Sequence, residues 1–161
     1  MSIGYPTWYE GGCPDIEAVM RDLFSPLLTG VNVVSWVPPD YGEELNAGIT
    51  YLRIYRLGGH INVDTRSWVD ETRIQFAALS ASRDDSWRLV EFVRQVLYAF
   101  RFGGTVGGNS GLTYIVVPGE IVGPQLVPEQ FRDERLVPVT FEVHADRRKG
   151  LPDYRTALGL N

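Results

Sequence analysis

The sequence predicts an α+β fold: a mixed, mainly antiparallel sheet of about five strands with two helices packed on one of its faces. Two segments place apolar residues at helical spacing, and five segments are rich in β-branched and aromatic residues. The chain has 161 residues, of which 44% are hydrophobic, so we expect a single domain with one core over residues 1–161. Residues 1–13 are expected to form an N-terminal arm and residues 146–161 a C-terminal tail.

The first helix is predicted to begin at Pro14, because proline suits the first helical position. Asp15 and Glu17 follow near the positive end of the helix dipole, where carboxylates are favourable. Pro26 and Gly30 end the helix. Its apolar stripe consists of Ile16, Val19, Met20, Leu23 and Phe24.

Three strands are predicted to follow this helix. Residues 31–37 are β-branched and aromatic, residues 49–57 carry apolar side chains on both faces, and residues 72–79 alternate. We expect residues 38–48 to form a polar loop and residues 58–70 to form a second loop without core periodicity.

The second helix is predicted over residues 85–100, because Ser82 and Asp85 match a capping box. Its polar and apolar residues separate onto two faces, so the helix needs a sheet to lie on. The apolar positions are Leu89, Val90, Phe92, Val93, Val96, Leu97 and Phe100.

Residues 103–111 include five glycines, which predicts a mobile or partner-ordered loop. Two further strands are predicted after this loop. The first covers residues 112–122 with a break near Pro118, and the second covers residues 136–144.

Side chains that carry catalysis or bind metals are sparse. His60 and His144 lie far apart in the sequence, Cys13 is the single cysteine, and no serine-hydrolase, zinc-protease or P-loop motif occurs. We therefore predict no catalytic, cofactor-binding or metal site. The alternatives are a small hydrolase that uses His60 or His144, a two-histidine metal site, and a module that binds a small ligand in an apolar pocket.

The net charge of −5 argues against a dedicated nucleic-acid binder, which needs a basic face to displace counterions from phosphates. No apolar run reaches the roughly 18 residues of a membrane helix, so we expect a soluble protein that does not act at a membrane.

Five stretches of the sequence resemble the tail terminator (tail-completion) proteins of long-tailed, siphovirus-type bacteriophages. They are the opening helix at 14–24, the strand and prolines at 33–39, the strands at 51–56 and 70–76, and the helix at 85–100. The resemblance covers residues 14–145 and includes no catalytic signature.

The resemblance implies a structural virion protein without a cofactor. Such proteins form a hexameric ring on the growing tail tube, stop its polymerisation and present a surface to the head side. The implied partners are further copies of the chain, the tail tube protein and the head-tail connector. DNA passes through the lumen without sequence-specific binding, which suits an acidic protein. A head-tail connector or neck protein of the same virion is the alternative.

The resemblance also implies a location at the head-proximal end of the tail, reached after assembly in the host cytoplasm. Contacts with partners are predicted in the two loops and in the basic tail, because Arg and Trp often anchor interfaces and glycine-rich loops can order on a partner. The candidate interface residues are Arg66, Trp68, Gly104, Gly107, Asn109, Arg147 and Arg148. The sheet face opposite the helices is also expected to need a partner, with Trp36, Tyr51, Tyr55, Trp68 and Tyr114 upon it.

Overall fold

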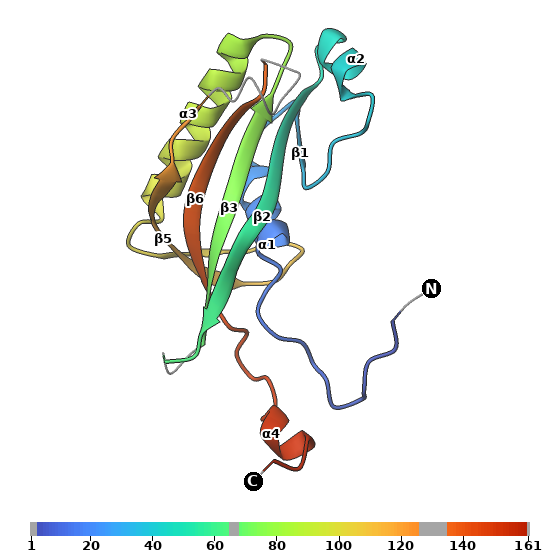
Figure 1. The fold of residues 1–161 in the computed structure, drawn as a ribbon, viewed down its shortest axis with the longest axis vertical. Helices are drawn as coiled ribbons and strands as arrows, with labels where there is room; N and C mark the ends of the chain where they lie inside the picture. The colour runs from blue at the N-terminus through green and yellow to red at the C-terminus, as the bar shows by residue number, and fades with distance from the viewer. Residues whose placement is uncertain (1–2, 65–67, 126–134, 161) are drawn as a thin grey trace.

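The computed structural model describes residues 3–64, 68–125 and 135–160 (Figure 1). Six strands form one sheet in the order β1-β2-β3-β6-β5-β4, in which the β1–β2 pair is parallel and the other pairs are antiparallel. The elements are α1 (Ile16–Phe24), β1 (Val31–Val34), α2 (Tyr41–Asn46), β2 (Thr50–Asn62), β3 (Val69–Leu79), α3 (Arg83–Ala99), β4 (Gly104–Val106), β5 (Thr113–Val122), β6 (Val137–Asp146) and α4 (Tyr154–Ala157). The predicted α+β class with a mainly antiparallel sheet is confirmed.

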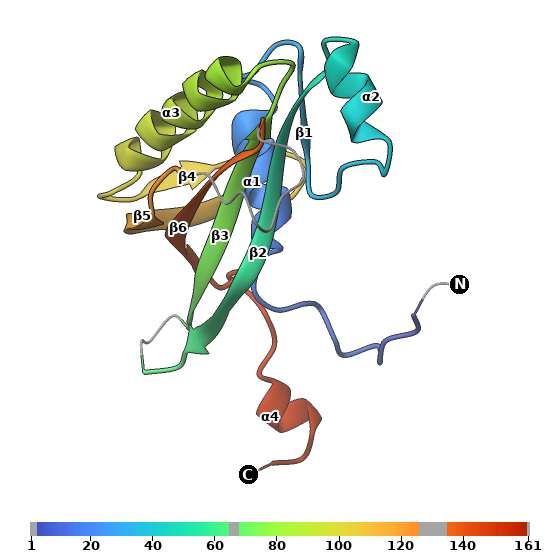
Figure 2. The same ribbon diagram turned by 45° about the horizontal axis from the view of Figure 1, so that its top comes forward.

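Helix α1 begins two residues later than predicted. Pro14 was expected at the first helical position, whereas the helix starts at Ile16. Asp15 is its N-cap residue, and the Asp15 carboxylate accepts hydrogen bonds from the backbone N–H groups of Glu17 and Ala18. Its apolar stripe is buried. The helix contacts β1, β2 and β4, so the two ends of the curled sheet approach it from opposite sides (Figure 2).

Helix α3 is capped by Ser82, whose hydroxyl oxygen accepts a hydrogen bond from the backbone N–H of Asp85, as the capping box predicts. Leu89, Val90 and Leu97 are buried. Phe92, which was expected in the core, is 38% exposed. At about 100° per residue Phe92 lies roughly 200° around the helix from Val90, so it faces away from the sheet.

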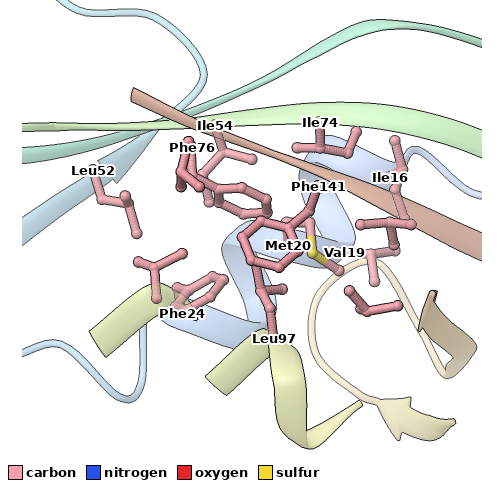
Figure 3. Packing of buried hydrophobic residues seen from close by; sticks show 14 of the residues in the cluster. Ile16, Val19, Met20, Phe24, Leu52, Ile54, Ile74, Phe76, Leu97 and Phe141 are labelled. Atoms are coloured by element: carbon pink, nitrogen blue, oxygen red, sulfur yellow. The ribbon is translucent and has the colours of Figure 1, made fainter. Parts of the chain in front are cut away.

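Both long helices pack on the same face of the sheet and share one core with β2, β3 and β6, which confirms the predicted layering. Phe76 of β3 lies at the centre of this core (Figure 3). Its ring centroid is 5.7 Å from that of Phe24 in α1 and 6.3 Å from that of Phe141 in β6, both in edge-to-face arrangements. The three rings therefore join α1 to the two central strands.

A second, smaller cluster covers the upper part of the opposite sheet face. It forms because residues 41–46, predicted to lie within a polar loop, instead form helix α2. The helix buries Leu45 against Tyr51 of β2 and Leu79 of β3. Two apolar residues at i and i+4, Tyr41 and Leu45, were the only local signal for a helix this short.

Strands β2 and β3 are longer than predicted, and most of the expected loop at 58–70 is paired backbone. Gly59 pairs with Thr72 and Asn62 pairs with Val69. A register shift between Arg56 and Gly58 interrupts the alternation of side chains, which is why the sequence pattern breaks there although the strand continues.

The remaining boundaries also differ from the predicted ones. The first strand is four residues long and ends at Val34 rather than at residue 37, while β6 runs to Asp146 rather than to residue 144. The predicted break near Pro118 is confirmed, since the β5–β6 register shifts between Val116 and Gly119. The sixth strand, β4, lies inside the glycine-rich segment that was predicted to be a loop, because backbone pairing with β5 requires no side chains.

Where β2 and β3 extend beyond the helices, an ion pair between exposed Arg56 and buried Asp70 lies at the edge of the core. The Asp70 side chain is 2% exposed, and the Arg56 guanidinium donates to both of its carboxylate oxygens at 2.9 Å. The backbone N–H of Arg56 also donates to the Glu17 carboxylate at 2.8 Å, which ties β2 to the first turn of α1. No helix of the described residues is long and apolar enough to cross a membrane.

We predict that Gly59→Ala destabilises the protein by about 2 to 3 kcal/mol, because a Cβ atom at this position would lie 2.1 Å from the Glu71 carbonyl oxygen and φ is +133°. Gly58→Ala is the matched control. A Cβ atom at Gly58 meets nothing within 4 Å, so we expect a change within about 0.5 kcal/mol. Urea unfolding of the two variants measures the difference, and equal losses would contradict this account of the bulge.

Candidate assembly interface

Three parts of the chain meet at the end of the sheet away from α2: the β2–β3 hairpin, the β4–β5 connection and the segment after β6 (Figure 1). A groove of about 660 Å³ lies between residues 109–114 and 146–149. A second hollow, of about 420 Å³, lies between Trp68 and the C-terminal tail, and Arg147 lines both. We call this region the basal surface, and define it by Trp68, Asn109, Leu112, Arg147, Arg148 and Tyr154.

Arg147 is the central residue of the basal surface. Its guanidinium carbon lies 4.7 Å from the ring centroid of Trp68 and 5.8 Å from that of Tyr154, both within range of a cation–π attraction. Its backbone N–H donates to the Trp68 carbonyl oxygen at 3.2 Å, which continues the β3–β6 ladder by one hydrogen bond. Trp68 and Arg147 are therefore held against each other by main chain and side chain alike.

Trp68 has a left-handed backbone with φ of 50°, the one non-glycine residue among those described to do so. Such a conformation costs about 1 to 3 kcal/mol for a bulky residue and persists where the surroundings enforce it. The side chain remains 44% exposed. The hairpin thus presents a large aromatic side chain to solvent at an energetic cost, which is typical of an interface residue.

The N-terminal arm and the C-terminal tail contact each other through Tyr154. The Tyr154 hydroxyl donates to the Gly11 carbonyl oxygen at 2.6 Å and accepts from the Glu10 backbone N–H at 3.1 Å. Its ring stacks on Tyr9 at 5.8 Å and lies 5.7 Å from Trp8. The arm therefore packs on the C-terminal tail of its own chain, yet Trp8 and Tyr9 stay 38% and 42% exposed.

The connection between β4 and β5 is fastened to α1 through Asp22. The Asp22 carboxylate accepts a hydrogen bond from the Ser110 backbone N–H at 2.7 Å and another from the Ser110 hydroxyl. These two hydrogen bonds hold the pKa of Asp22 below its usual range. The same segment exposes Leu112 at its end, with 82% of the side chain accessible. The glycine-rich segment is thus anchored at its base while one apolar side chain projects from it.

Four of the seven predicted interface residues gather at the basal surface, namely Trp68, Asn109, Arg147 and Arg148. Gly104 lies in β4 against Phe100, and Gly107 lies near Leu112, so both shape the connection from within. Arg66 lies outside the described residues. Sequence reasoning missed Leu112 and Tyr154. Leu112 was predicted to begin a strand, and Tyr154 is an aromatic residue in the predicted C-terminal tail, which was a usable signal.

A second exposed patch lies on the sheet face opposite the helices, as predicted. We call it the sheet-face patch, and it consists of Trp36, Arg53 and Tyr55. The Arg53 guanidinium carbon lies 4.3 Å from the Tyr55 ring centroid and 6.0 Å from that of Trp36, which is 76% exposed. Tyr51, expected on this face, is covered by Leu45 instead.

Tyr114 lies elsewhere than expected, whereas the Cys13 thiol is a partly packed side chain. Tyr114 lines the basal groove and therefore does not belong to the sheet-face patch. Burial raises the pKa of the Cys13 thiol, and the nearby Asp70 carboxylate raises it further. Cys13 is therefore a partly packed thiol, and the structure gives no support to a thiolate activated by the helix dipole.

The model of a family described as "Phage tail termination protein" matches residues 12–152 of the chain. No curated protein matches the sequence.

We predict that Asp22→Asn destabilises the protein by about 1 kcal/mol at pH 7, because the carboxylate is the better acceptor for the two Ser110 donors. The pKa of Asp22 is lower in the folded than in the unfolded state. Its stabilisation is therefore complete above the unfolded pKa of about 4 and is lost as the pH falls through the folded pKa. Urea unfolding at several pH values should show the wild type and the variant converging in acid.

Substitutions at two glycines of the β4–β5 connection test the Asp22–Ser110 contact in a second way. A Cβ atom at Gly108 would lie 2.5 Å from the Asp22 carboxyl carbon, whereas at Gly107 it would lie 3.4 Å from a Leu112 methyl group. Gly108→Ala should therefore reproduce the acid-dependent loss, and Gly107→Ala should not. A pH-independent difference between wild type and Asp22→Asn would refute the proposed role of the carboxylate.

Proposed function

Because the chain belongs to the family of phage tail termination proteins, we propose that it is the ring-forming terminator of a long phage tail. The family is structural, so the protein is a component of the phage tail rather than an enzyme, and the hydrolase hypothesis has no support from it. Six copies close into a ring on the end of the tail tube and stop its polymerisation. The opposite end of the ring receives the head-tail connector, and DNA passes through the lumen without sequence-specific binding, which the chain's net charge of −5 suits.

The basal surface is the observation that carries this proposal. It combines an exposed tryptophan, an arginine stacked on that tryptophan, an exposed leucine and the basic residues that follow β6. Aromatic and arginine side chains dominate the binding energy of protein interfaces. They gather around the segment that follows β6, on the side of the molecule that carries α4 (Figure 1), and a protein that caps a tube needs a contact of this kind at one of its ends.

A closed ring of identical subunits needs two different surfaces that fit each other, in addition to the surfaces at its ends. The sheet-face patch supports a subunit contact, because Trp36 is exposed on the side of the molecule and Arg53 is already stacked between two rings. Side contacts through the sheet-face patch and an end contact through the basal surface would let one subunit bind two neighbours and the tube.

We predict a six-subunit species when the purified protein is mixed with tail tubes, as measured by light scattering and native mass spectrometry of the protein alone and with tubes. A strict monomer in both samples would contradict ring formation. A closed ring of another subunit number, with binding to the connector but not to the tube, would favour the neck-protein alternative.

We predict that Trp68→Ala impairs the contact with the tail tube and that Trp36→Ala impairs the contact between subunits of the ring. Trp68→Ala should keep the ring and the circular dichroism of the wild type, yet yield tails of uncontrolled length or tails that do not join heads. Trp36→Ala should weaken the ring itself, with a loss of about 2 kcal/mol or more per contact if the side chain is an interface anchor. Electron micrographs with normal tail lengths and normal joining from Trp68→Ala would place the tube contact elsewhere.

A further inference from the structure

Three neighbouring strands align a row of metal-binding side chains on the sheet face that the helices do not cover. Glu71 of β3 lies directly opposite His60 of β2 on one side and His144 of β6 on the other. Directly opposed residues of an antiparallel pair have Cβ atoms about 5 Å apart and point to the same face. Glu142 is two residues from His144 on β6 and therefore shares that face. The two histidines of the chain thus meet around one carboxylate.

The side chains in this row already contact one another. His144 Nε2 lies 2.7 Å from Glu142 Oε1, and His60 Nε2 lies 3.5 Å from Glu71 Oε2. One ligand atom each from Glu71, Glu142 and His144 lies within 4.8 Å of the other two. The Asn62 amide donates to Glu71 Oε1 at 2.9 Å, which orients the carboxylate and leaves Oε2 available.

The environment of the row is intermediate between core and solvent. The side chains of Glu71 and His144 are 23% and 24% exposed, while His60 is 72% exposed. A hollow of about 270 Å³ is lined by His60, Glu71 and Glu142 together with Gly59, Thr72 and Arg73. The hollow has room for an ion with a bound water, and the exposed histidine is free to rotate towards it.

We propose that Glu71, Glu142 and His144 bind a divalent transition-metal ion of the zinc class, with His60 as a fourth ligand. Imidazole nitrogens and carboxylates together suit Zn²⁺ and its borderline neighbours, whereas Mg²⁺ and Ca²⁺ prefer oxygen ligands alone. Zinc–ligand distances of about 2.0 to 2.1 Å place tetrahedral ligand atoms about 3.3 Å apart. Rotation of the partly exposed side chains adjusts the present spacings to that value. The 2.7 Å between His144 Nε2 and Glu142 Oε1 widens, and the spacings of up to 4.8 Å shorten. Arg73, whose charge opposes the ion, weakens the site without blocking it.

A metal ion bound at this site would also stabilise the neighbouring basal surface. Glu71 of β3 is three residues from Trp68, which directly precedes that strand, and His144 of β6 is three residues from Arg147, which directly follows that strand. An ion shared by β2, β3 and β6 therefore links the strands that hold the basal surface in place. The binding itself stands apart from the proposed role in the tail, so either can fail without the other.

The test uses the untagged full-length chain, titrated with Zn²⁺ by calorimetry and with Co²⁺ by visible absorption. We expect one ion per chain, a tetrahedral or five-coordinate Co²⁺ spectrum, and weak or no binding of Mg²⁺ and Ca²⁺. His144→Ala and Glu71→Gln should each lower the Zn²⁺ affinity at least tenfold, and His60→Ala should lower it less. Glu43→Gln, which removes a carboxylate on α2, is the matched control and should bind like the wild type. Arg73→Gln should bind more tightly.

The two histidine rings provide a second readout, because each gives its own signals in a long-range ¹H–¹⁵N spectrum. Zn²⁺ should shift the ring signals of His144 and His60 together at one equivalent. The proposal is overturned if the wild type binds no Zn²⁺ at about 100 µM, or if binding survives both His144→Ala and Glu71→Gln. Loss of binding with Cys13→Ser alone would place the ion elsewhere and overturn it as well. Circular dichroism of each variant excludes unfolding as the cause of lost binding.

Discussion

The register of β2, β3 and β6 is the constraint on which the rest of the structure depends. These strands bury one face against α1 and α3, and the Phe24–Phe76–Phe141 contacts leave a single alignment in which all three rings lie in the core. A slip of one residue would turn every core side chain towards solvent. The same alignment determines which side chains lie on the opposite face of the sheet. The row of His60, Glu71 and His144 is therefore a consequence of how the hydrophobic core packs.

The strands run further than the helices that cover them, and this difference in length creates the basal surface. Beyond the partly buried Arg56–Asp70 ion pair, the ends of β2 and β3 extend past α1 and α3 (Figure 1). Backbone pairing nevertheless continues to Asn62 and Val69, since the ladder satisfies its own polar groups. The glycine at position 59 lets the bulged strand approach β3 closely at this point. The result is a rigid extension that carries exposed aromatic and arginine residues away from the core.

At the other elements of the basal surface too, hydrogen bonds hold a segment in place while a large side chain remains exposed. Asp22 holds the base of the β4–β5 connection, while Leu112 remains exposed. Tyr154 fastens the N-terminal arm to the C-terminal tail, while Trp8 and Tyr9 keep part of their rings accessible. Side chains that are ordered before binding lose less conformational entropy when a partner arrives. A protein that must recognise the end of a tube, and thereafter stay bound, benefits from this arrangement.

The sequence by itself determined both long helices, the Ser82 cap of α3, the core-facing positions of the central strands and the α+β class, because these follow from local periodicity and capping chemistry. It also identified Trp68, Asn109, Arg147 and Arg148 as interface candidates. Tertiary structure alone decided that α2 covers Tyr51, that residues 58–62 continue a strand, and that β4 exists. Bulges and backbone pairing of glycines leave no periodic signal in side chains. Tertiary structure alone also brought His60 and His144 to Glu71, because residues distant in sequence become neighbours only through strand order and register.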